Sequence, residues 1–327
     1  MNSLVLAPFS DDGLARLRAL GRVAHEPWTA TQTLWDPEEL GRRLAAEAFD
    51  ALVIEADFAF EELFAEAPRL RIVAVCRGAL NHVDLDAATD AGVVVVHTPA
   101  RNAQAVAEFA VAQLFALARR TAQADRYIRD GLWADLADPY TRFQGRELAG
   151  AKLGLVGLGA VGRAIARIAA ALDMRAIAYD PYVADAENAE LVTLDELLRS
   201  ADFVCLQAPD TESTAGMIDA ERIAAMKPGA LLVNVASPYA VDRRALADAL
   251  ARGHIAGAAI DVHEAQPVPP DSPFLGLPNV LLTPHIGGAT RETVERHSAM
   301  AAEDIERFAR GLRPLRLANP HVWERRR

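Results

Sequence analysis

The sequence predicts an α/β protein made of two Rossmann-like, doubly wound parallel sheets. The first reason is the alternation of short apolar runs, rich in valine, isoleucine and leucine, with segments of helical periodicity. The second is a glycine pattern, G-x-G-x-x-G, between one such run and a helical segment. The third is the length, because 327 residues are more than one such sheet needs. We therefore expect two domains, each with helices on both faces of its sheet.

The first part of the chain, up to about residue 98, predicts a small parallel sheet. Its short apolar runs predict strands at 4–8, 51–56, 70–76 and 93–99. Helical spacing between these runs predicts helices at 10–20, 60–68 and 83–92. Ser10 can cap the first of these helices, and Pro68 ends the second. Strands and helices thus alternate as a doubly wound domain requires.

The second part of the chain repeats this alternation at greater length. A helix that is apolar nearly all round is predicted at 105–120, and we expect it at a domain or subunit junction. Six further strands are predicted at 152–157, 175–180, 202–207, 230–235, 256–262 and 279–284. The proline-rich segment 264–278 is expected to be a loop. A capped helix at 289–312 should return to the first domain, so we expect one domain at 1–98 and 291–327 and a second at 99–290.

Composition limits the possible partners and compartments. The net charge of −11, spread along the chain, argues against a nucleic acid or an anionic membrane as partner. Cys76 and Cys205 both lie in apolar runs, which fits free thiols in a reducing cytoplasm. The first residues lack the basic stretch of a signal peptide, and no apolar run reaches membrane-spanning length. Histidines and cysteines are scattered singly, so no metal site is expected.

The glycine pattern has the context of a dinucleotide-binding turn. Gly157, Gly159 and Gly162 follow an apolar strand and open an amphipathic helix. We expect Gly157 to allow the tight turn, Gly159 to admit a pyrophosphate, and Gly162 to let the helix approach the strand. The next strand ends in Asp180, whose carboxylate can bind adenosine ribose hydroxyls and would repel a 2′-phosphate. NAD is therefore predicted over NADP; the alternative is a glycine turn in a protein that binds no nucleotide.

From about Leu70 to Arg310 the chain resembles the D-isomer-specific 2-hydroxyacid dehydrogenases. The resemblance rests on six stretches: VDLDAATDAGVVVVHTPARNAQAVAEF, GRELAGAKLGLVGLGAVGRAIARIA, LDELLRSADFVCLQAP, MKPGALLVNVA, VDRRALADALARGHIAGAAIDV and NVLLTPHIGGAT. It implies a flavodoxin-like substrate domain, an inserted NAD-binding domain, and an active site between them. It also implies a homodimer formed through the NAD-binding domain, with 105–120 and 133–143 as interface segments.

The resemblance assigns cofactor contacts by position in these motifs. It implies that NAD lies against Gly157, Gly159, Ala160, Val161, Gly162, Asp180, Pro181, Ala208, Pro209, Thr214, Val235, Ala236, Asp261 and Gly287.

The family's chemistry uses a histidine, a carboxylate and an arginine, and only the first is present here. His285, in TPHIGG, stands at the position of the acid–base histidine. The carboxylate that holds this histidine is replaced by Gln266, and the arginine that binds the substrate carboxylate is replaced by Ser237. Gln266 can orient the imidazole without favouring its charged form, an arrangement similar to the family's formate dehydrogenase branch. Ser237 can give a neutral hydrogen bond only.

Another cation is needed if the substrate is a carboxylate. By resemblance, Arg77, Gly78 and Ala79 form the loop whose backbone N–H groups bind that carboxylate. Our hypothesis is that Arg77 itself reaches the substrate; the alternative is a solvated surface arginine. Arg101 begins the next helix, and the same two alternatives apply to it: contact with the substrate or a solvated surface position.

Two classes of function remain open. The first is an NAD-dependent oxidoreductase that transfers hydride between nicotinamide and a small 2-hydroxy or 2-oxo acid or a related substrate, with an altered site. The second is a catalytically impaired homologue that binds NAD(H) as a sensor or scaffold, since a fold does not fix a function. Turnover of NADH with a panel of 2-oxo acids, aldehydes and ketones separates the two.

Overall fold

A computed structural model describes all 327 residues, and they form two compact units. Unit 1 consists of residues 1–102 and 290–327, and unit 2 consists of residues 103–289. The first break thus lies after Asn102, where the sequence placed it after residue 98. The extra residues belong to unit 1 because Arg101 forms an ion pair with Glu55 and its carbonyl accepts a hydrogen bond from Arg296.

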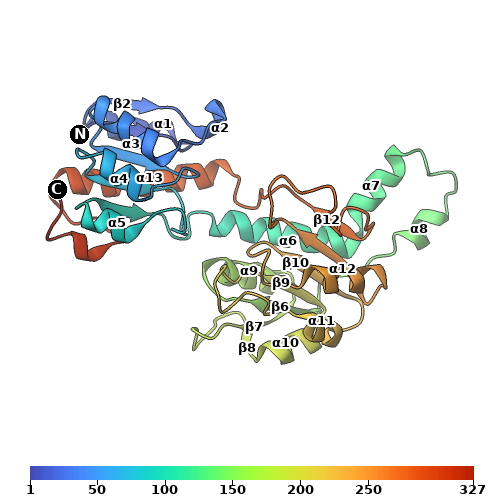
Figure 1. The fold of residues 1–327 in the computed structure, drawn as a ribbon. Helices are drawn as coiled ribbons and strands as arrows, with labels where there is room; N and C mark the ends of the chain where they lie inside the picture. Colours follow the sequence, from blue (N-terminus) through green and yellow to red (C-terminus); the bar gives the residue numbers. More distant parts are fainter. The chain divides into compact units, whose positions relative to one another are not determined.

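Unit 1 is built on a five-stranded parallel sheet with the strand order β2-β1-β3-β4-β5, the order of a flavodoxin-like fold (Figure 1). Its strands are β1 (Ser3–Val5), β2 (Val23–His25), β3 (Ala51–Ile54), β4 (Ile72–Val75) and β5 (Val94–His97). Its helices are α1 (Asp11–Arg18), α2 (Trp28–Thr31), α3 (Pro37–Ala46), α4 (Glu61–Glu66), α5 (Leu85–Asp90) and α13 (Arg291–Ala309), followed by the 3-10 turn η1 (Pro320–Val322).

Both faces of this sheet are covered. Helices α3, α4 and α5 bury one face, and α1 and α13 bury the other. The central strands are apolar on both sides, which is why their sequences read as continuous hydrophobic runs. Helix α13 is capped by Thr290, whose side chain accepts a hydrogen bond from the Thr293 amide, and it packs against α1. This last helix belongs to unit 1.

Unit 2 is built on a seven-stranded parallel sheet with the order β12-β11-β10-β9-β6-β7-β8. Its strands are β6 (Lys152–Val156), β7 (Arg175–Tyr179), β8 (Glu190–Leu191), β9 (Phe203–Leu206), β10 (Ala230–Asn234), β11 (Ile255–Ile260) and β12 (Val280–Leu282). Its helices are α6 (Ala103–Arg119), α7 (Thr121–Arg129), α8 (Asp138–Arg142), α9 (Ala160–Ala171), α10 (Leu194–Ser200), α11 (Ala220–Ala225) and α12 (Arg243–Ala251). The order of the strands along the sheet reverses between β6 and β9, which pair in parallel, and such a switch point is where sheets of this kind bind ligands.

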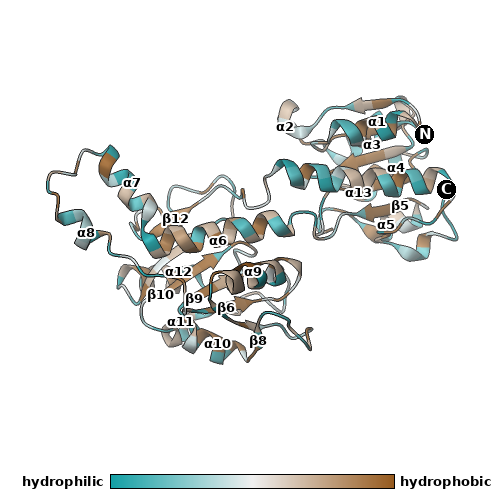
Figure 2. Ribbon diagram, turned by 180° about the vertical axis from the view of Figure 1, so that it is seen from behind, coloured by the Kyte–Doolittle hydropathy of each residue, from teal (hydrophilic) through white to brown (hydrophobic).

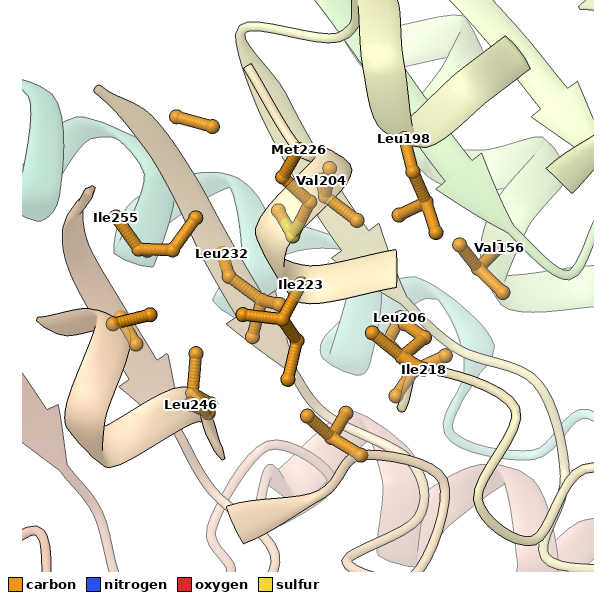
Figure 3. Close-up of a cluster of buried hydrophobic side chains, with 14 of the residues drawn as sticks. Val156, Leu198, Val204, Leu206, Ile218, Ile223, Met226, Leu232, Leu246 and Ile255 are labelled. Carbon is orange, nitrogen blue, oxygen red and sulfur yellow. The ribbon is translucent and has the colours of Figure 1, made fainter. Parts of the chain in front are cut away.

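The core of unit 2 also has two layers. Helices α10, α11 and α12 cover one face of the sheet, where Leu198, Ile223, Leu232 and Leu246 meet (Figure 3). Helices α6 and α9 cover the other face. Each large apolar side chain buried here contributes roughly 1.5–3 kcal/mol of stability. The two layers hold the carboxyl ends of the strands in fixed register, and the loops that follow those ends form the site described below.

The sequence analysis did not predict β2, β8, α2, α3, α7 or α8. Strand β2 is a half-buried edge strand, and β8 has two residues. Helices α7 and α8 project from the rest of unit 2, so they lack the wide apolar stripe of a core helix (Figure 1). Figure 2 shows the contrast between the apolar strands and the polar residues along the helices. No helix is both long and apolar enough to cross a membrane.

Candidate active site

The turn after β6 requires glycine at two positions. Gly157 has φ of +98°, and a Cβ there would lie 2.9 Å from the Ala208 backbone nitrogen. A Cβ on Gly162 would lie 2.4 Å from the Gly157 carbonyl oxygen, because the first turn of α9 presses on the turn before it. A Cβ on Gly159, in contrast, would meet nothing within 4 Å. The turn is therefore closely packed against the protein and open where a ligand can approach.

Helix α9 presents its amino terminus to this open space. Gly159 caps the helix without a side-chain hydrogen bond, and no acidic residue stands in the first turn. The first-turn residues Ala160 and Val161 thus leave backbone N–H groups and the positive end of the helix dipole for an anion. This arrangement fits the pyrophosphate of a dinucleotide.

Asp180, directly after β7, is tied to the same turn. Its carboxylate accepts hydrogen bonds from the Leu158 amide at 2.8 Å and the Tyr182 amide at 2.9 Å. Each oxygen keeps a further lone pair, so ribose hydroxyls can still bind. Pro181, which follows, is exposed. A fixed carboxylate at this strand end fits an adenosine ribose and disfavours a 2′-phosphate.

The remaining predicted cofactor positions lie at the same edge of the sheet. Ala208 is buried and Pro209 is exposed in the loop after β9, where the Thr214 hydroxyl donates to the Pro209 carbonyl at 2.6 Å. Val235 and Ala236 are half-buried directly after β10. The structure therefore gathers these residues, Asp180 and the glycine turn along one edge of unit 2.

Asp261 follows β11 and organises the loop that carries His285. Its carboxylate accepts hydrogen bonds from the Thr283 hydroxyl at 2.7 Å, the Ile286 amide at 2.9 Å and the Gly287 amide at 2.8 Å. The side chain is 3% exposed, and His285 has φ of +58°. A left-handed conformation costs a non-glycine residue roughly 1–2 kcal/mol. Hydrogen bonds to a charged acceptor contribute roughly 1.5–3 kcal/mol each and offset that cost.

The side chains of Gln266 and His285, which the sequence analysis paired, lie within hydrogen-bond distance of each other. The Gln266 Nε2 atom lies 3.0 Å from the His285 Nδ1 atom, and both residues are exposed. An amide nitrogen at Nδ1 fits a neutral imidazole whose Nδ1 accepts a hydrogen bond and whose Nε2 bears the proton. Rotation of the amide by half a turn would present its oxygen to the Nδ1–H of an imidazolium. Gln266 can therefore orient both charge states without favouring either through charge.

Ser237 is placed differently from His285 and Gln266. It is fully buried, its hydroxyl donates to the Asp210 Oδ1 atom at 3.0 Å, and it accepts from the Tyr239 amide at 3.2 Å. The Asn234 side chain fixes the turn by donating to the Ser237 carbonyl at 2.8 Å. The hydroxyl is thus engaged within the protein. Sequence reasoning did not single out Asp210, although an acidic residue directly after Ala-Pro at a strand end was a visible signal.

Arg77, Gly78 and Ala79 follow β4 in unit 1. The backbone of Gly78 and Ala79 is exposed, and the Gly78 carbonyl lies 3.0 Å from the His97 Nδ1 atom. The half-buried Arg77 side chain makes no hydrogen bond or ion pair within the protein. Burial lowers the pKa of its guanidinium, and the charge of Glu55 opposes this effect. A half-buried cation without a partner is a potential anion site.

A polar network surrounds Arg77 at the same edge of the unit 1 sheet. Arg101 binds Glu55 at 2.7 Å and donates to the His297 Nδ1 atom at 2.6 Å. His82 is 5% exposed, and neither of its ring nitrogens has a hydrogen-bond partner. Burial lowers the pKa of His82 and of His297 to about 4. Glu55 is therefore neutralised by Arg101, which leaves the charge of Arg77 in excess.

Comparisons with known proteins agree with this geometry. The model of the family described as D-isomer specific 2-hydroxyacid dehydrogenase, NAD binding domain, matches residues 111–287. A Bacillus subtilis protein named as a 2-hydroxyacid dehydrogenase is 36% identical over 94% of this chain and 91% of its own. A glyoxylate reductase of Korarchaeum cryptofilum is 42% identical over 84% of this chain and 83% of its own. The crystal structure of the TT0316 protein from Thermus thermophilus superimposes with a TM-score of 0.87 at 36% identity, covering 97% of this chain and 100% of that one.

Replacement of Asp261 by asparagine should loosen the His285 loop. The NH₂ group of the asparagine would face one of the three donors that the Asp261 carboxylate accepts from, so at least one hydrogen bond would be lost. We expect kcat with saturating NADH to fall at least about tenfold, since misplacement of a reacting group is costly. The melting temperature should fall by a few degrees, at roughly 2–4 °C per kcal/mol. Asp57→Asn, at a buried unit 1 carboxyl whose pKa burial raises, is the control and should retain kcat. Unchanged kcat in Asp261→Asn would contradict the proposal that Asp261 fixes the His285 loop.

Acidification should destabilise the protein through its buried neutral histidines. Between about pH 6.5 and pH 4, His82 and His297 are protonated in the unfolded chain and remain neutral in the folded protein. This contribution is present in full above about pH 6.5 and is lost as the pH falls toward 4. At pH 5 the loss is up to about 2 kcal/mol for each histidine. Urea unfolding at pH 7 and pH 5 should therefore show a smaller acid effect in His82→Leu than in the wild type. Equal acid effects would exclude His82 as a contributor.

Proposed function

Since the chain belongs to the D-isomer specific 2-hydroxyacid dehydrogenase family, and is an NAD-dependent oxidoreductase acting on CH–OH groups, we propose that it interconverts a small 2-hydroxy acid and its 2-oxo acid. The observation that carries the proposal is the exposed His285–Gln266 pair, at the edge of unit 2 that also carries the glycine turn. The name of the Korarchaeum relative, a glyoxylate reductase, supports a small 2-oxo acid as substrate class.

The residues around the glycine turn are proposed to hold NAD. The amino terminus of α9 would bind the pyrophosphate, and Asp180 would bind the adenosine ribose. When bound, NAD supplies the hydride donor or acceptor of the reaction. The turn needs no rearrangement for this role, because Gly159 is open and the other two glycines are already packed.

His285 is proposed to exchange a proton with the substrate oxygen. Gln266 lies at Nδ1, so the proton would move through Nε2. Because Gln266 carries no charge, it does not stabilise the imidazolium as a carboxylate would. Gln266 can therefore orient the ring in either direction of the reaction. Ser237, proposed from the sequence as a neutral substrate contact, would take part by fixing Asp210, since its hydroxyl is buried.

Arg77 is proposed to bind the substrate carboxylate, with the backbone of Gly78 and Ala79. The support is that this guanidinium is half-buried and has no carboxylate partner of its own, because Arg101 already binds Glu55. A bidentate guanidinium–carboxylate pair gives both charge and orientation. Arg77 would thus supply the positive charge that Ser237 lacks.

Loss of NADH absorbance with a panel of short 2-oxo acids, aldehydes and ketones tests this function. We expect turnover with at least one 2-oxo acid and a severe loss in His285→Ala. Arg77→Ala should raise KM for 2-oxo acids about tenfold or more, since it removes hydrogen bonds from a cation. Arg69→Ala, at an exposed arginine of the same unit, is the matched control. Tight NADH binding with no turnover on any compound would instead favour the sensor or scaffold.

We further propose that unit 2 forms a homodimer through the segment from α6 to α8. This segment exposes large apolar side chains that a lone chain would leave in water: Phe115, Ile128, Leu132, Trp133, Leu136 and Tyr140. Leu136, 89% exposed, and Tyr140, 84% exposed, lie on the projecting part of this segment.

The double substitution Trp133→Asp with Leu136→Asp should convert the dimer to a monomer in light scattering after gel filtration. Two charges in a desolvated contact cannot be accommodated. Leu312→Asp changes an exposed leucine of unit 1 and should leave the mass unchanged. A wild-type chain that is monomeric at micromolar concentration would refute the proposal.

A further inference from the structure

Three strands of unit 2 end in or near an aspartate, and these aspartates differ in what they bind. Asp180 after β7 and Asp261 after β11 use both carboxylate oxygens for hydrogen bonds within the protein. Asp210 after β9 uses only Oδ1, which accepts from the Ser237 hydroxyl. The Asp210 side chain is exposed, and its Oδ2 atom has no hydrogen-bond or ion-pair partner in the protein.

The single bond to Asp210 comes from a rigid donor. Ser237 is fully buried, and the Tyr239 amide donates to the same hydroxyl oxygen, so the hydroxyl proton is directed to Asp210. On the other side, the Thr214 hydroxyl closes the loop by donating to the Pro209 carbonyl at 2.6 Å and by accepting from the Thr211 amide at 3.0 Å. Asp210 is therefore a fixed acceptor, with one oxygen anchored and the other turned outward.

The charge around Asp210 is not compensated within unit 2. Arg243, in the helix that follows the β10 loop, is paired with Glu264. No arginine or lysine forms an ion pair with Asp210. This carboxylate lies between the glycine turn after β6 and the His285 loop after β12 in the order of the sheet. The carboxyl edge of the unit 2 sheet thus carries an unpaired negative charge in the loop after β9.

We propose that Asp210, positioned by Ser237, determines specificity by binding a hydrogen-bond donor on the substrate, either a hydroxyl group or a cationic nitrogen. The proposal rests on the function proposed above and specifies the substrate's second polar group. A carboxylate at that place would meet the charge of Asp210, so dicarboxylic 2-oxo acids are poor substrates. A methyl group would leave Oδ2 without a partner and gain nothing from it.

The test uses a series of 2-oxo acids that differ at the far end of the chain. The compounds are 6-hydroxy-2-oxohexanoate, 5-guanidino-2-oxopentanoate, 2-oxohexanoate and 2-oxohexanedioate. We expect kcat/KM for the hydroxyl or guanidino compound to exceed that for the dicarboxylate about tenfold or more, with the methyl compound between them. Whichever donor compound ranks first identifies the donor.

Two variants separate charge from structure. Asp210→Asn keeps an acceptor oxygen for the Ser237 hydroxyl and removes the charge, so it should bring the ratio of donor compound to dicarboxylate close to one. Ser237→Ala keeps the charge and removes the anchor, so it should reduce the preference for the donor compounds over 2-oxohexanoate while the dicarboxylate stays disfavoured. The matched 2-hydroxy acids, titrated calorimetrically into the NAD⁺ complex, test the same order by affinity alone.

The outcomes are distinguishable. Equal kcat/KM across the series, or a ratio unchanged in Asp210→Asn, overturns the inference and leaves the proposed function intact. A fall in NADH affinity in Asp210→Asn with unchanged discrimination would assign Asp210 to the cofactor instead. Absence of turnover with every compound would refute the proposed function. The titrations would then decide the inference, which fails if the dicarboxylate binds as well as the donor compounds.

Discussion

The hydrogen bonds that the Asp261 carboxylate accepts are the interaction on which the loop carrying His285 depends. This side chain lies at the end of β11, and it binds the amides of the two residues that follow His285. While both amides bind this carboxylate, His285 adopts a left-handed backbone conformation, which is uncommon for a residue other than glycine. The strain is local and modest, while the acceptor is charged and buried. The fold therefore fixes the backbone position of His285 before any substrate or cofactor binds.

The same principle recurs along the whole carboxyl edge of the unit 2 sheet. Asp180 binds the Leu158 amide, Gln207 donates to the Gly157 carbonyl, and Asn234 donates to the Ser237 carbonyl. Each bond links a strand end to the backbone of a loop, so the loops are fixed relative to strands that the two hydrophobic layers already hold. Binding in such a site costs little ordering entropy, because the groups are in place beforehand.

The extent to which sequence predicted this site follows from how local each determinant is. The glycine turn is predictable because φ and close approach at Gly157 and Gly162 exclude other residues within one short segment. The pairing of Gln266 with His285 was inferred from motif position, and the structure places them together. The burial of Ser237 and its bond to Asp210 was not predictable, because it joins loops after two different strands. Helices α7 and α8 were not predicted for a related reason. They project from the core, and a helix that buries no wide face lacks the apolar periodicity from which helices are predicted.

Ser237 and Arg77, which follow strand ends of different units, differ in what each could offer an anion. Ser237 is short and fully buried, so an anion cannot be held there, and the carboxylate it anchors would oppose one. Arg77, in contrast, is a half-buried guanidinium, and its neighbour Glu55 already forms an ion pair with Arg101. A buried charge without a partner destabilises the folded protein. Proteins retain such a charge at sites where a bound ligand supplies the partner.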